Sequence, residues 1–428
     1  MSFDKQIIKS ERLSESYYKI KHPSGLTVLV WEMPEFSSVY ALFGTKYGSI
    51  NTKFKTKNDK DFIEVPEGIA HFLEHKLFEN EDCDVFELYA KTGASGNAYT
   101  SFDQTAYLFS CTENYKESLK ILLDFVQSPY FTQETVDKEQ GIIGQEIRMC
   151  EDTPWRQVFF NLLRCLYVEH PVKIEIAGTV ESIAEIDADL LYSCYNTFYN
   201  LNNMALSIAG NIKLDEVLAI CDEHLKIKEN PELVTAFPDE PDEVNEKLFI
   251  QKMAVGTPLF AIGYKSVPFD GKDRIRKELE ASILLNLICG STSELYKSLY
   301  DEGLINSNFY TEVDSGDGFF ASVFSGESKN PQKVFERIKE EISRIKSEGI
   351  DSDMFEIIKK AEYGKLISGL NSAEKCATLM FESDLLIGVD AFENIEALAS
   401  ITEQNILESI DVLFDNNKSA ISIVEANV

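Results

Sequence analysis

One short segment, residues 68–79, restricts the fold and chemistry of this chain more than any other, and it reads GIAHFLEHKLFE. Within it His71, Glu74 and His75 form the pattern H-x-x-E-H. The apolar residues around these three predict a buried helix, and side chains three and four positions apart lie on one face of a helix. The two imidazoles can therefore bind one metal ion, with the Glu74 carboxylate beside them.

This residue set is typical of a catalytic zinc site. Two neutral imidazoles suit Zn²⁺, which usually takes a third protein ligand and keeps one position for water. A carboxylate next to that water can accept its proton. The chain has five His among 428 residues, so the spacing is a specific signal, although such motifs also occur by chance, with structural His and a solvated Glu. His170 is a further candidate ligand, but it precedes Pro171 in a predicted loop, where we favour a structural role.

The third ligand is predicted on a second helix at residues 132–152. Glu139 and Glu146 are seven residues apart, so they lie two turns apart on one face of that helix. The alternative is that both are ordinary solvent-facing acids, as most Glu are. Glu151 and Asp152 are rival ligands, but they lie at the helix end, where capping or turn roles compete with metal binding.

Residues 93–111, GASGNAYTSFDQTAYLFSC, predict two strands around an Asp103-Gln104 turn. The first strand is rich in small residues and follows the predicted metal helix. It could form an edge to which an extended peptide adds through backbone hydrogen bonds. Alternatively, Gly96 and Ala98 only allow close packing, and Asn97 is a simple turn residue.

The length of 428 residues exceeds one ordinary core and indicates at least two domains. Residues 226–247 contain three prolines and many acids without periodicity, which is typical of a linker. The flanking segments repeat a similar order of strands, helices, a hairpin and a helix. We predict a domain at 1–228, a linker at 229–247 and a related domain at 248–428. The last has no His and cannot hold a matching pair.

Composition narrows the class of partner. A hydrophobic fraction of 44% is that of a globular protein, and the formal charge of −31 disfavours nucleic acid and anionic lipid as partners. The chain has no run of 18 apolar residues and its N-terminal segment is polar, so we expect a cytoplasmic protein without a membrane span. The eight Cys are scattered without a C-x-x-C pair, which favours reduced, packed thiols.

These segments resemble the pitrilysin–insulinase family of zinc metallopeptidases, or inverzincins, over nearly the whole chain. The resemblance rests on GTKYGSI, GIAHFLEHKLFE, GASGNAYTSFDQTAYLF, KEQGIIGQEI and HPVKIEIAGTVESI. It is strongest to bacterial two-domain members, similar to mitochondrial processing peptidase subunits and to peptidases associated with elongation factor P modification. It implies an α+β fold of two related domains, each a mixed, mainly antiparallel sheet covered by helices. It also implies a clamshell arrangement around a chamber that admits peptides or unfolded segments.

The resemblance also implies roles for individual residues. His71, His75 and Glu146 would bind one Zn²⁺ per chain, and Glu74 would be the general base. Glu139, one heptad before Glu146, would assist proton movement or hold a ligand in place.

The same resemblance places Asn97 and Ala98 on a substrate-binding edge strand. One departure from the family pattern concerns an Arg–Tyr pair that contacts substrate in many relatives. Here the corresponding text is DEGLIN, with Glu302 and Asn306 at those positions. We therefore expect a heterodimer in which a paralogous chain supplies that pair, or otherwise a homodimer.

The residues and the resemblance together predict a zinc-dependent endopeptidase that acts on peptides or unfolded proteins. The alternative is a catalytically quiet assembly or peptide-binding subunit that keeps its zinc helix. A divalent metal other than zinc is a further alternative, because site affinity alone does not select the metal in a cell.

Overall fold

The computed structural model describes residues 4–79 and 85–427 and divides into two compact units. Each unit contains a segment from the other half of the sequence. The predicted division into the consecutive domains 1–228 and 248–428 has no such exchange of segments. Unit 1 consists of Met1–Ile147, Glu175–Ala236 and Ile367–Phe392, and unit 2 of Arg148–Ile174, Phe237–Leu366 and Glu393–Val428.

Unit 1 is built on a seven-stranded sheet in the order β1-β2-β3-β9-β4-β8-β7. Strands β3 and β9 are parallel, and the other neighbours are antiparallel. The strands are β1 (Asp4–Ser10), β2 (Glu15–Lys21), β3 (Thr27–Glu32), β4 (Val39–Thr45), β7 (Ser95–Thr100), β8 (Thr105–Cys111) and β9 (Met204–Gly210).

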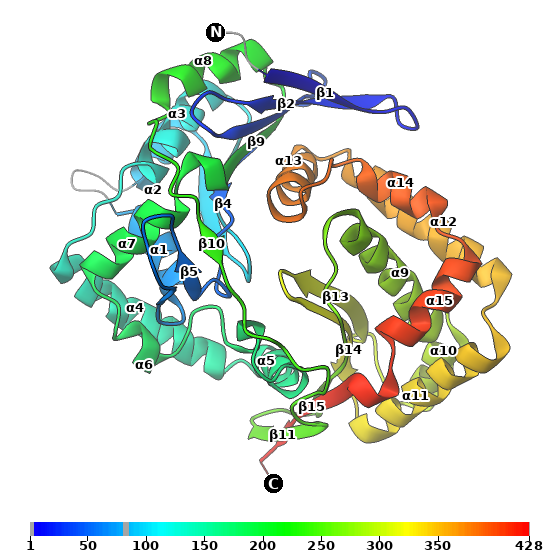
Figure 1. Cartoon of the computed structure of the whole chain (residues 1–428). Helices are drawn as coiled ribbons and strands as arrows, with labels where there is room; N and C mark the ends of the chain where they lie inside the picture. The colour runs from blue at the N-terminus through cyan, green and yellow to red at the C-terminus, as the bar shows by residue number, and fades with distance from the viewer. Residues whose placement is uncertain (1–3, 80–84, 428) are drawn as a thin grey trace. The chain divides into compact units, whose positions relative to one another are not determined.

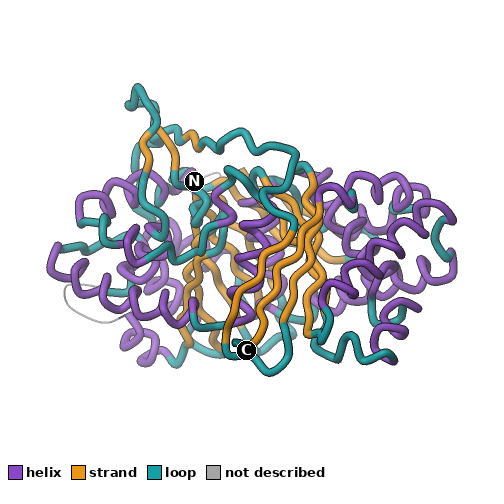
Figure 2. The backbone as a smooth tube through the Cα atoms, turned by 90° about the horizontal axis from the view of Figure 1, so that it is seen from below, coloured by secondary structure: helices purple, strands orange, loops and turns teal. Residues whose placement is uncertain are grey.

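Helices pack on both faces of this sheet (Figures 1 and 2). On one face the apolar sides of α1 and α3 join the main core, and on the other α13 packs with Tyr17 and Trp31 of the sheet. The helical elements are α1 (Ile69–Leu77), α2 (Val85–Thr92), α3 (Tyr115–Val126), α4 (Gln133–Glu151), α6 (Val180–Ile183), α7 (Ala188–Phe198), η2 (Leu201–Asn203), α8 (Leu214–His224), α13 (Ala373–Phe381) and η3 (Glu382–Ile387).

Unit 2 is built on a five-stranded sheet in the order β11-β15-β12-β14-β13, in which only β11 and β15 are parallel. The strands are β11 (Leu248–Met253), β12 (Leu259–Ser266), β13 (Tyr310–Gly316), β14 (Phe319–Glu327) and β15 (Ser419–Ala426). The helical elements are α5 (Pro154–Leu166), η1 (Pro171–Lys173), α9 (Gly271–Cys289), α10 (Glu294–Asp301), α11 (Pro331–Glu348), α12 (Ser352–Gly369), α14 (Glu393–Ser400), α15 (Glu403–Leu413) and η4 (Asn416–Lys418).

The two units share one topology. The order β3-β9-β4-β8-β7 in unit 1 matches β11-β15-β12-β14-β13 in unit 2, including the one parallel pair. Each sheet is covered on one face by a helix from the other half of the sequence: α5 lies on β15, β12 and β11, and α13 lies on β9, β4 and β3. The predicted α+β fold, with two similar and mainly antiparallel sheets covered by helices, is confirmed. The clamshell arrangement stays a prediction.

Local predictions agree with these elements, with one correction. Residues 17–32 alternate apolar and polar side chains around a Pro-Ser-Gly turn, which predicts a hairpin. The structure contains this hairpin as β2–β3, and its turn has Gly25 at φ +95°, a conformation that favours glycine. The charged composition of residues 52–64 predicts a loop, and the structure corrects this prediction. This segment contains β5 (Lys53–Lys55) and β6 (Ile63–Glu64), and β5 pairs with both β6 and β10 (Val234–Thr235), because backbone pairing does not require an alternating apolar pattern.

The seven described cysteines form no disulfide with one another, and six of them are buried. This agrees with the predicted reduced state, whereas Cys83 lies outside the described residues. None of the helices in the described part of the chain is long and apolar enough to cross a membrane.

Candidate metal centre

Helix α1 is fixed at its start by a glycine and along its length by the core of unit 1. Gly68 precedes the helix with φ +86°, and a Cβ at this position would lie 2.3 Å from the Ala177 carbonyl oxygen. The apolar side of the helix, including Phe72 and Leu73, is fully buried. Because that side is anchored, the opposite side holds His71 and His75 in a defined orientation.

Three predicted residues converge at one point of unit 1. One ligand atom from each of His71, His75 and Glu146 lies within 4.8 Å of the other two. His71 Nε2 is 3.6 Å from Glu146 Oε1, and His75 Nε2 is 3.5 Å from Glu146 Oε2. Tetrahedral ligands held about 2.0–2.1 Å from Zn²⁺ lie roughly 3.3–3.4 Å apart, so this donor set fits the ion. The Glu146 side chain is 41% exposed, which leaves the centre accessible to solvent.

Glu139 lies behind His75. Its Oε1 is 3.0 Å from His75 Nδ1, and this hydrogen bond holds the pKa of Glu139 below its usual value. Burial lowers the pKa of His75, but its hydrogen bonds with Glu139 and Glu146 outweigh that effect and raise the pKa to about 10. A carboxylate that accepts from Nδ1 orients the ring and leaves Nε2 directed at the metal position.

Glu74 lies on the same helix but has a different partner. Thr100, at the end of β7, donates its hydroxyl to Glu74 Oε2 at 2.7 Å. Burial raises the pKa of Glu74, although the Thr100 hydrogen bond and the charge of His75 oppose this effect. A carboxylate with a raised pKa is a better proton acceptor near neutral pH. Glu74 is therefore suited to proton transfer rather than to metal binding.

Thr100 was not among the site residues predicted from the sequence. The sequence did contain an indication of its position, because residues two apart on a strand share a face, so Thr100 lies on the same face as Ala98. Once β7 is placed against α1, that face is directed at the metal helix. The buried Lys76, which is paired with Glu79 and whose charge further lowers the pKa of Glu139, was also missed, since its sequence position predicts no such contact.

Asn97 and Ala98 lie on β7, the last strand of the seven-stranded sheet. Among the described strands β7 pairs only with β8, so the predicted edge is confirmed. Asn97 is exposed, and its Oδ1 is 2.9 Å from the backbone nitrogen of Ala98. The role of these two residues in substrate binding stays a prediction.

The structure does not bring the rival ligands into this centre. Among the described residues, neither Glu151 nor Asp152 belongs to the group that could hold a metal. His170 lies in unit 2, where its Nδ1 accepts from the Val172 backbone at 3.1 Å and its Nε2 is 3.0 Å from the Asp317 carbonyl oxygen. Burial lowers its pKa to about 4. These contacts agree with the structural role favoured for this residue.

The positions that depart from the family pattern have local partners in unit 2. Glu302 forms ion pairs with Lys333 at 3.0 Å and Arg337 at 2.9 Å. Asn306 donates to a carboxylate oxygen of Glu327 at 2.7 Å. Both side chains therefore stabilise the local fold.

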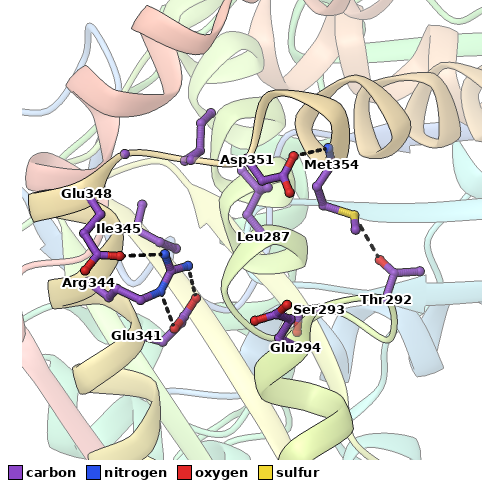
Figure 3. Close-up of a pocket in the computed structure, with 12 residues that line it drawn as sticks. Leu287, Thr292, Ser293, Glu294, Glu341, Arg344, Ile345, Glu348, Asp351 and Met354 are labelled. Atoms are coloured by element: carbon purple, nitrogen blue, oxygen red, sulfur yellow. Dashed lines mark hydrogen bonds and ion pairs between the residues drawn. The ribbon is translucent and has the colours of Figure 1, made fainter.

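A concavity of about 420 Å³ in unit 2 lies between α10, α11 and the start of α12 (Figure 3). Arg344, which lines this concavity, is paired with Glu341 at 2.6 Å and Glu348 at 3.3 Å. Asp351 accepts from the Met354 backbone at 3.0 Å. Because these charges satisfy one another or cap a helix, the chemistry of this concavity does not match that of the metal centre.

Comparison with protein families agrees with this geometry. The model described as "Insulinase (Peptidase family M16)" matches residues 64–180, which include all of α1 and α4. The model described as "Peptidase M16 inactive domain" matches residues 185–362. The first match includes β7 and β8 of unit 1, and the second includes β9 of unit 1 together with β11, β12, β13 and β14 of unit 2.

Similar proteins carry related names. The chain is 40% identical to "Uncharacterized zinc protease YmfH" of Bacillus subtilis, over 93% of this chain and 94% of that protein. It is 28% identical to "Uncharacterized zinc protease YmxG" of the same organism, over 76% of this chain and 80% of that protein. Among solved structures, a putative M16-like peptidase from Alicyclobacillus acidocaldarius is 34% identical, with a TM-score of 0.92 over 100% of this chain and 99% of that one.

Proposed function

The chain belongs to the insulinase (M16) peptidase family, and we propose that it is a zinc-dependent endopeptidase that cleaves peptides or unfolded protein segments. The convergence of His71, His75 and Glu146 around one position, with Glu74 beside it, carries this proposal. The donor set of two imidazoles and one carboxylate is that of catalytic zinc sites, and it leaves a fourth position for water.

The residues of unit 1 then have distinct roles. His71, His75 and Glu146 hold one ion per chain, and Glu139 orients the His75 ring through Nδ1. When bound, Zn²⁺ polarises the scissile carbonyl and lowers the pKa of the attacking water to about 7.

Glu74 performs the proton transfers. Its carboxylate accepts the proton of the attacking water and donates it to the leaving amine. The Thr100 hydroxyl holds Oε2 of Glu74, so the other oxygen, Oε1, is available for the reacting water. Burial raises the pKa of Glu74, which favours both acceptance and release of the proton near neutral pH.

Strand β7 is the proposed substrate-binding element. It lies against α1 and has an unpaired side within the described sheet, so an extended peptide can add to it through backbone hydrogen bonds. Asn97 and Ala98 lie in the middle of this edge. Such backbone recognition selects extended or unfolded segments. We also propose that a closed chamber surrounds the site.

We also propose that the protein acts with a partner chain, and we assign it a cellular compartment. The family resemblance implies an Arg–Tyr pair at the positions of Glu302 and Asn306, and both of these side chains have local contacts in unit 2. A paralogous chain that supplies the pair, or a second copy of this chain, would complete the site. We further propose that the protein acts in the cytoplasm.

A metal analysis combined with a peptidase assay tests the proposed function. The purified chain should contain about one zinc per chain and cleave a quenched fluorescent peptide library, and a chelator should abolish the cleavage, because catalytic zinc is required for it. Glu146→Gln should lower zinc occupancy, whereas Glu151→Gln, on the same helix, should not. Full occupancy in the Glu146 variant would remove that residue from the ligand set.

The partner is tested separately. Cleavage is measured for this chain alone and with partner chains recovered from its native cell, while the molar mass is determined in solution. We expect a large gain in turnover with a paralogous partner. Full turnover by a monomer would contradict the requirement for a partner and leave the zinc mechanism intact. A metal-replete protein that cleaves no peptide, with or without a partner, would favour the catalytically quiet subunit.

A further inference from the structure

The sheet of unit 2 has an edge strand in the position that β7 occupies in unit 1. This strand, β13, pairs with β14 on one side, and no strand in the described ranges 4–79 and 85–427 pairs on its other side. An unpaired edge presents backbone N–H and C=O groups to which an extended peptide can bind. Strand β13 therefore has the backbone geometry of a peptide-docking edge.

Two carboxylates lie on one face of this strand. Glu312 and Asp314 are two residues apart, so their side chains point to the same side of the sheet, together with Tyr310. Ser315 lies on the opposite side, where its hydroxyl donates to Glu278 of α9. The acid pair therefore faces away from α9, toward the face of the sheet on which α5 packs.

Aromatic rings from α5 and its C-terminal end lie beside this acidic face. The ring of Trp155 lies 6.2 Å from the ring of Tyr310. Burial raises the pKa of Tyr167, which follows α5, and the charge of the nearby Asp314 carboxylate adds to this effect. Helix α5 lies over β11, β15 and β12, so these rings border the acid pair on the edge side of the helix.

No cationic side chain from residues 4–79 or 85–427 pairs with these two carboxylates. The cross-strand neighbours of Glu312 and Asp314 on β14 are Val323 and Ala321, which have no side-chain donors. Asp314 Oδ2 is buried and accepts no hydrogen bond from the residues that the structure describes. Burial raises the pKa of both carboxyls, and the charge of Glu312 adds to this effect at Asp314. Burying two like charges without a partner is costly, and a bound cation would remove that cost.

We propose that Glu312 and Asp314 form a subsite for the basic side chain of an extended peptide that docks on β13. A guanidinium can bind two carboxylates through paired, charge-assisted hydrogen bonds, and the rings of Trp155 and Tyr310 supply cation–π attraction. The net charge of −31 favours the approach of such peptides. The inference rests on the proposed function for its substrate class, and it names basic, extended peptides within that class.

Binding without turnover tests this subsite. The full chain carrying Glu74→Gln is titrated into two fluorescein-labelled ten-residue peptides that differ only by arginine or citrulline at one central position. Citrulline has nearly the same shape as arginine but no charge. We expect the arginine peptide to bind at least tenfold more tightly, and Glu312→Gln/Asp314→Asn to abolish the difference while the binding of the citrulline peptide stays unchanged.

The matched control is Glu340→Gln/Glu356→Gln, which removes the same charge from exposed positions of unit 2. This control should keep the preference for arginine. The proposal is overturned if both peptides bind equally to the parent chain, or if the preference survives in the Glu312/Asp314 variant. This measurement does not depend on cleavage. If the unmodified chain cleaves no peptide, the proposed function is contradicted, but the binding of the two peptides still tests the subsite.

Discussion

The two units of this chain place the same pair of groups in the same position and surround it differently. In unit 1 the hydroxyl of Thr100, at the end of edge strand β7, donates to Glu74 of the helix packed against it. In unit 2 the hydroxyl of Ser315, near the end of edge strand β13, donates to Glu278 of α9, which packs against that strand. The scaffold thus fixes a helical Glu at a strand end in both units.

The neighbours of this Glu differ. His71 lies three residues before Glu74 and His75 lies one residue after it. At the same distances from Glu278 the chain has Ile275 and Leu279, and both are buried.

Arg274 donates to Glu278 at 2.9 Å and to the Ser315 carbonyl oxygen at 2.8 Å. The carboxylate of unit 2 is therefore neutralised by a guanidinium and serves the fold. A shared topology therefore positions the carboxylate in both units, and two neighbouring side chains decide its chemistry.

The largest expected effect separates the two glutamates. Glu74→Gln should lower kcat by about 10³-fold, since proton transfer by a positioned group contributes about 10²–10⁴-fold. Zinc content and thermal stability should be unchanged, because the buried carboxyl of Glu74 already has a raised pKa and loses little as an amide. Steady-state kinetics, metal analysis and thermal unfolding measure the three quantities.

Glu278→Gln is the matched change in unit 2. It should lower stability, because the buried Arg274 loses its charge partner, while the specific activity of the folded protein stays within about twofold. Equal losses of kcat in the two variants would show that both glutamates act in catalysis. That result would contradict the assignment of a structural role to Glu278.

An effect of about 10–100-fold is expected at Glu139, the typical cost of removing a carboxylate that supports a metal ligand. Glu139→Gln keeps the shape of the side chain but weakens the hydrogen bond to His75 Nδ1, which is 3.0 Å long in the structure. Competition with a fluorescent zinc chelator should show weaker zinc binding. Unchanged affinity together with a lower kcat would instead assign Glu139 to proton movement.

Thr100 should contribute about tenfold. A hydrogen bond to a charged group is worth about 1.5–3 kcal/mol, and a 1.4 kcal/mol loss in the transition state is about tenfold in rate. Thr100→Val should lower kcat with KM and zinc content unchanged, and Thr100→Ser should restore most of the rate. Ser315→Ala in unit 2 should leave kcat unaffected. Failure of the serine variant to restore activity would indicate that Thr100 acts through packing.

The elements of this fold could be predicted from sequence where apolar periodicity was strong. The segment of α1 and the edge position of β7 followed from residues 68–111, because helices and strands are encoded by local patterns. The exchange of α5 and α13 between the halves could not be predicted, since no local pattern states which sheet a helix will cover. Residues 352–427, which include α13 and β15, gave no prediction of their own.

The residues of the candidate site likewise divide into those predicted from local sequence and those that depend on the three-dimensional fold. His71, Glu74 and His75 are close in sequence, and their grouping needed only helical geometry. Glu146 was proposed from the face that it shares with Glu139, and the structure brings it within 3.6 Å of His71 Nε2. Thr100 and the apolar replacements in unit 2 depend on which strand each helix contacts, so they required the three-dimensional fold.

The smallest effect is expected at Asp314, where the comparison predicts a pH-dependent cost confined to unit 2. Burial and the charge of Glu312 raise the pKa of Asp314 to about 8, and the hydroxyl of Tyr167, from the end of α5, brings no positive charge. The folded protein therefore binds this proton more tightly than the unfolded chain does. The associated stability is fully present below the unfolded pKa of about 3.8 and is lost as pH rises to about 8.

Asp314→Asn should flatten this dependence, so that the variant is more stable than the parent above pH 8 and similar to it near pH 4. A gain of 1 kcal/mol would raise Tm by about 2–4 °C for a unit of this size. Thermal unfolding between pH 4 and pH 9 measures it, with Glu340→Gln as the control at an exposed position. A basic peptide should reduce the same difference in Tm between parent and variant, because a bound cation stabilises the ionised carboxylate that the variant lacks.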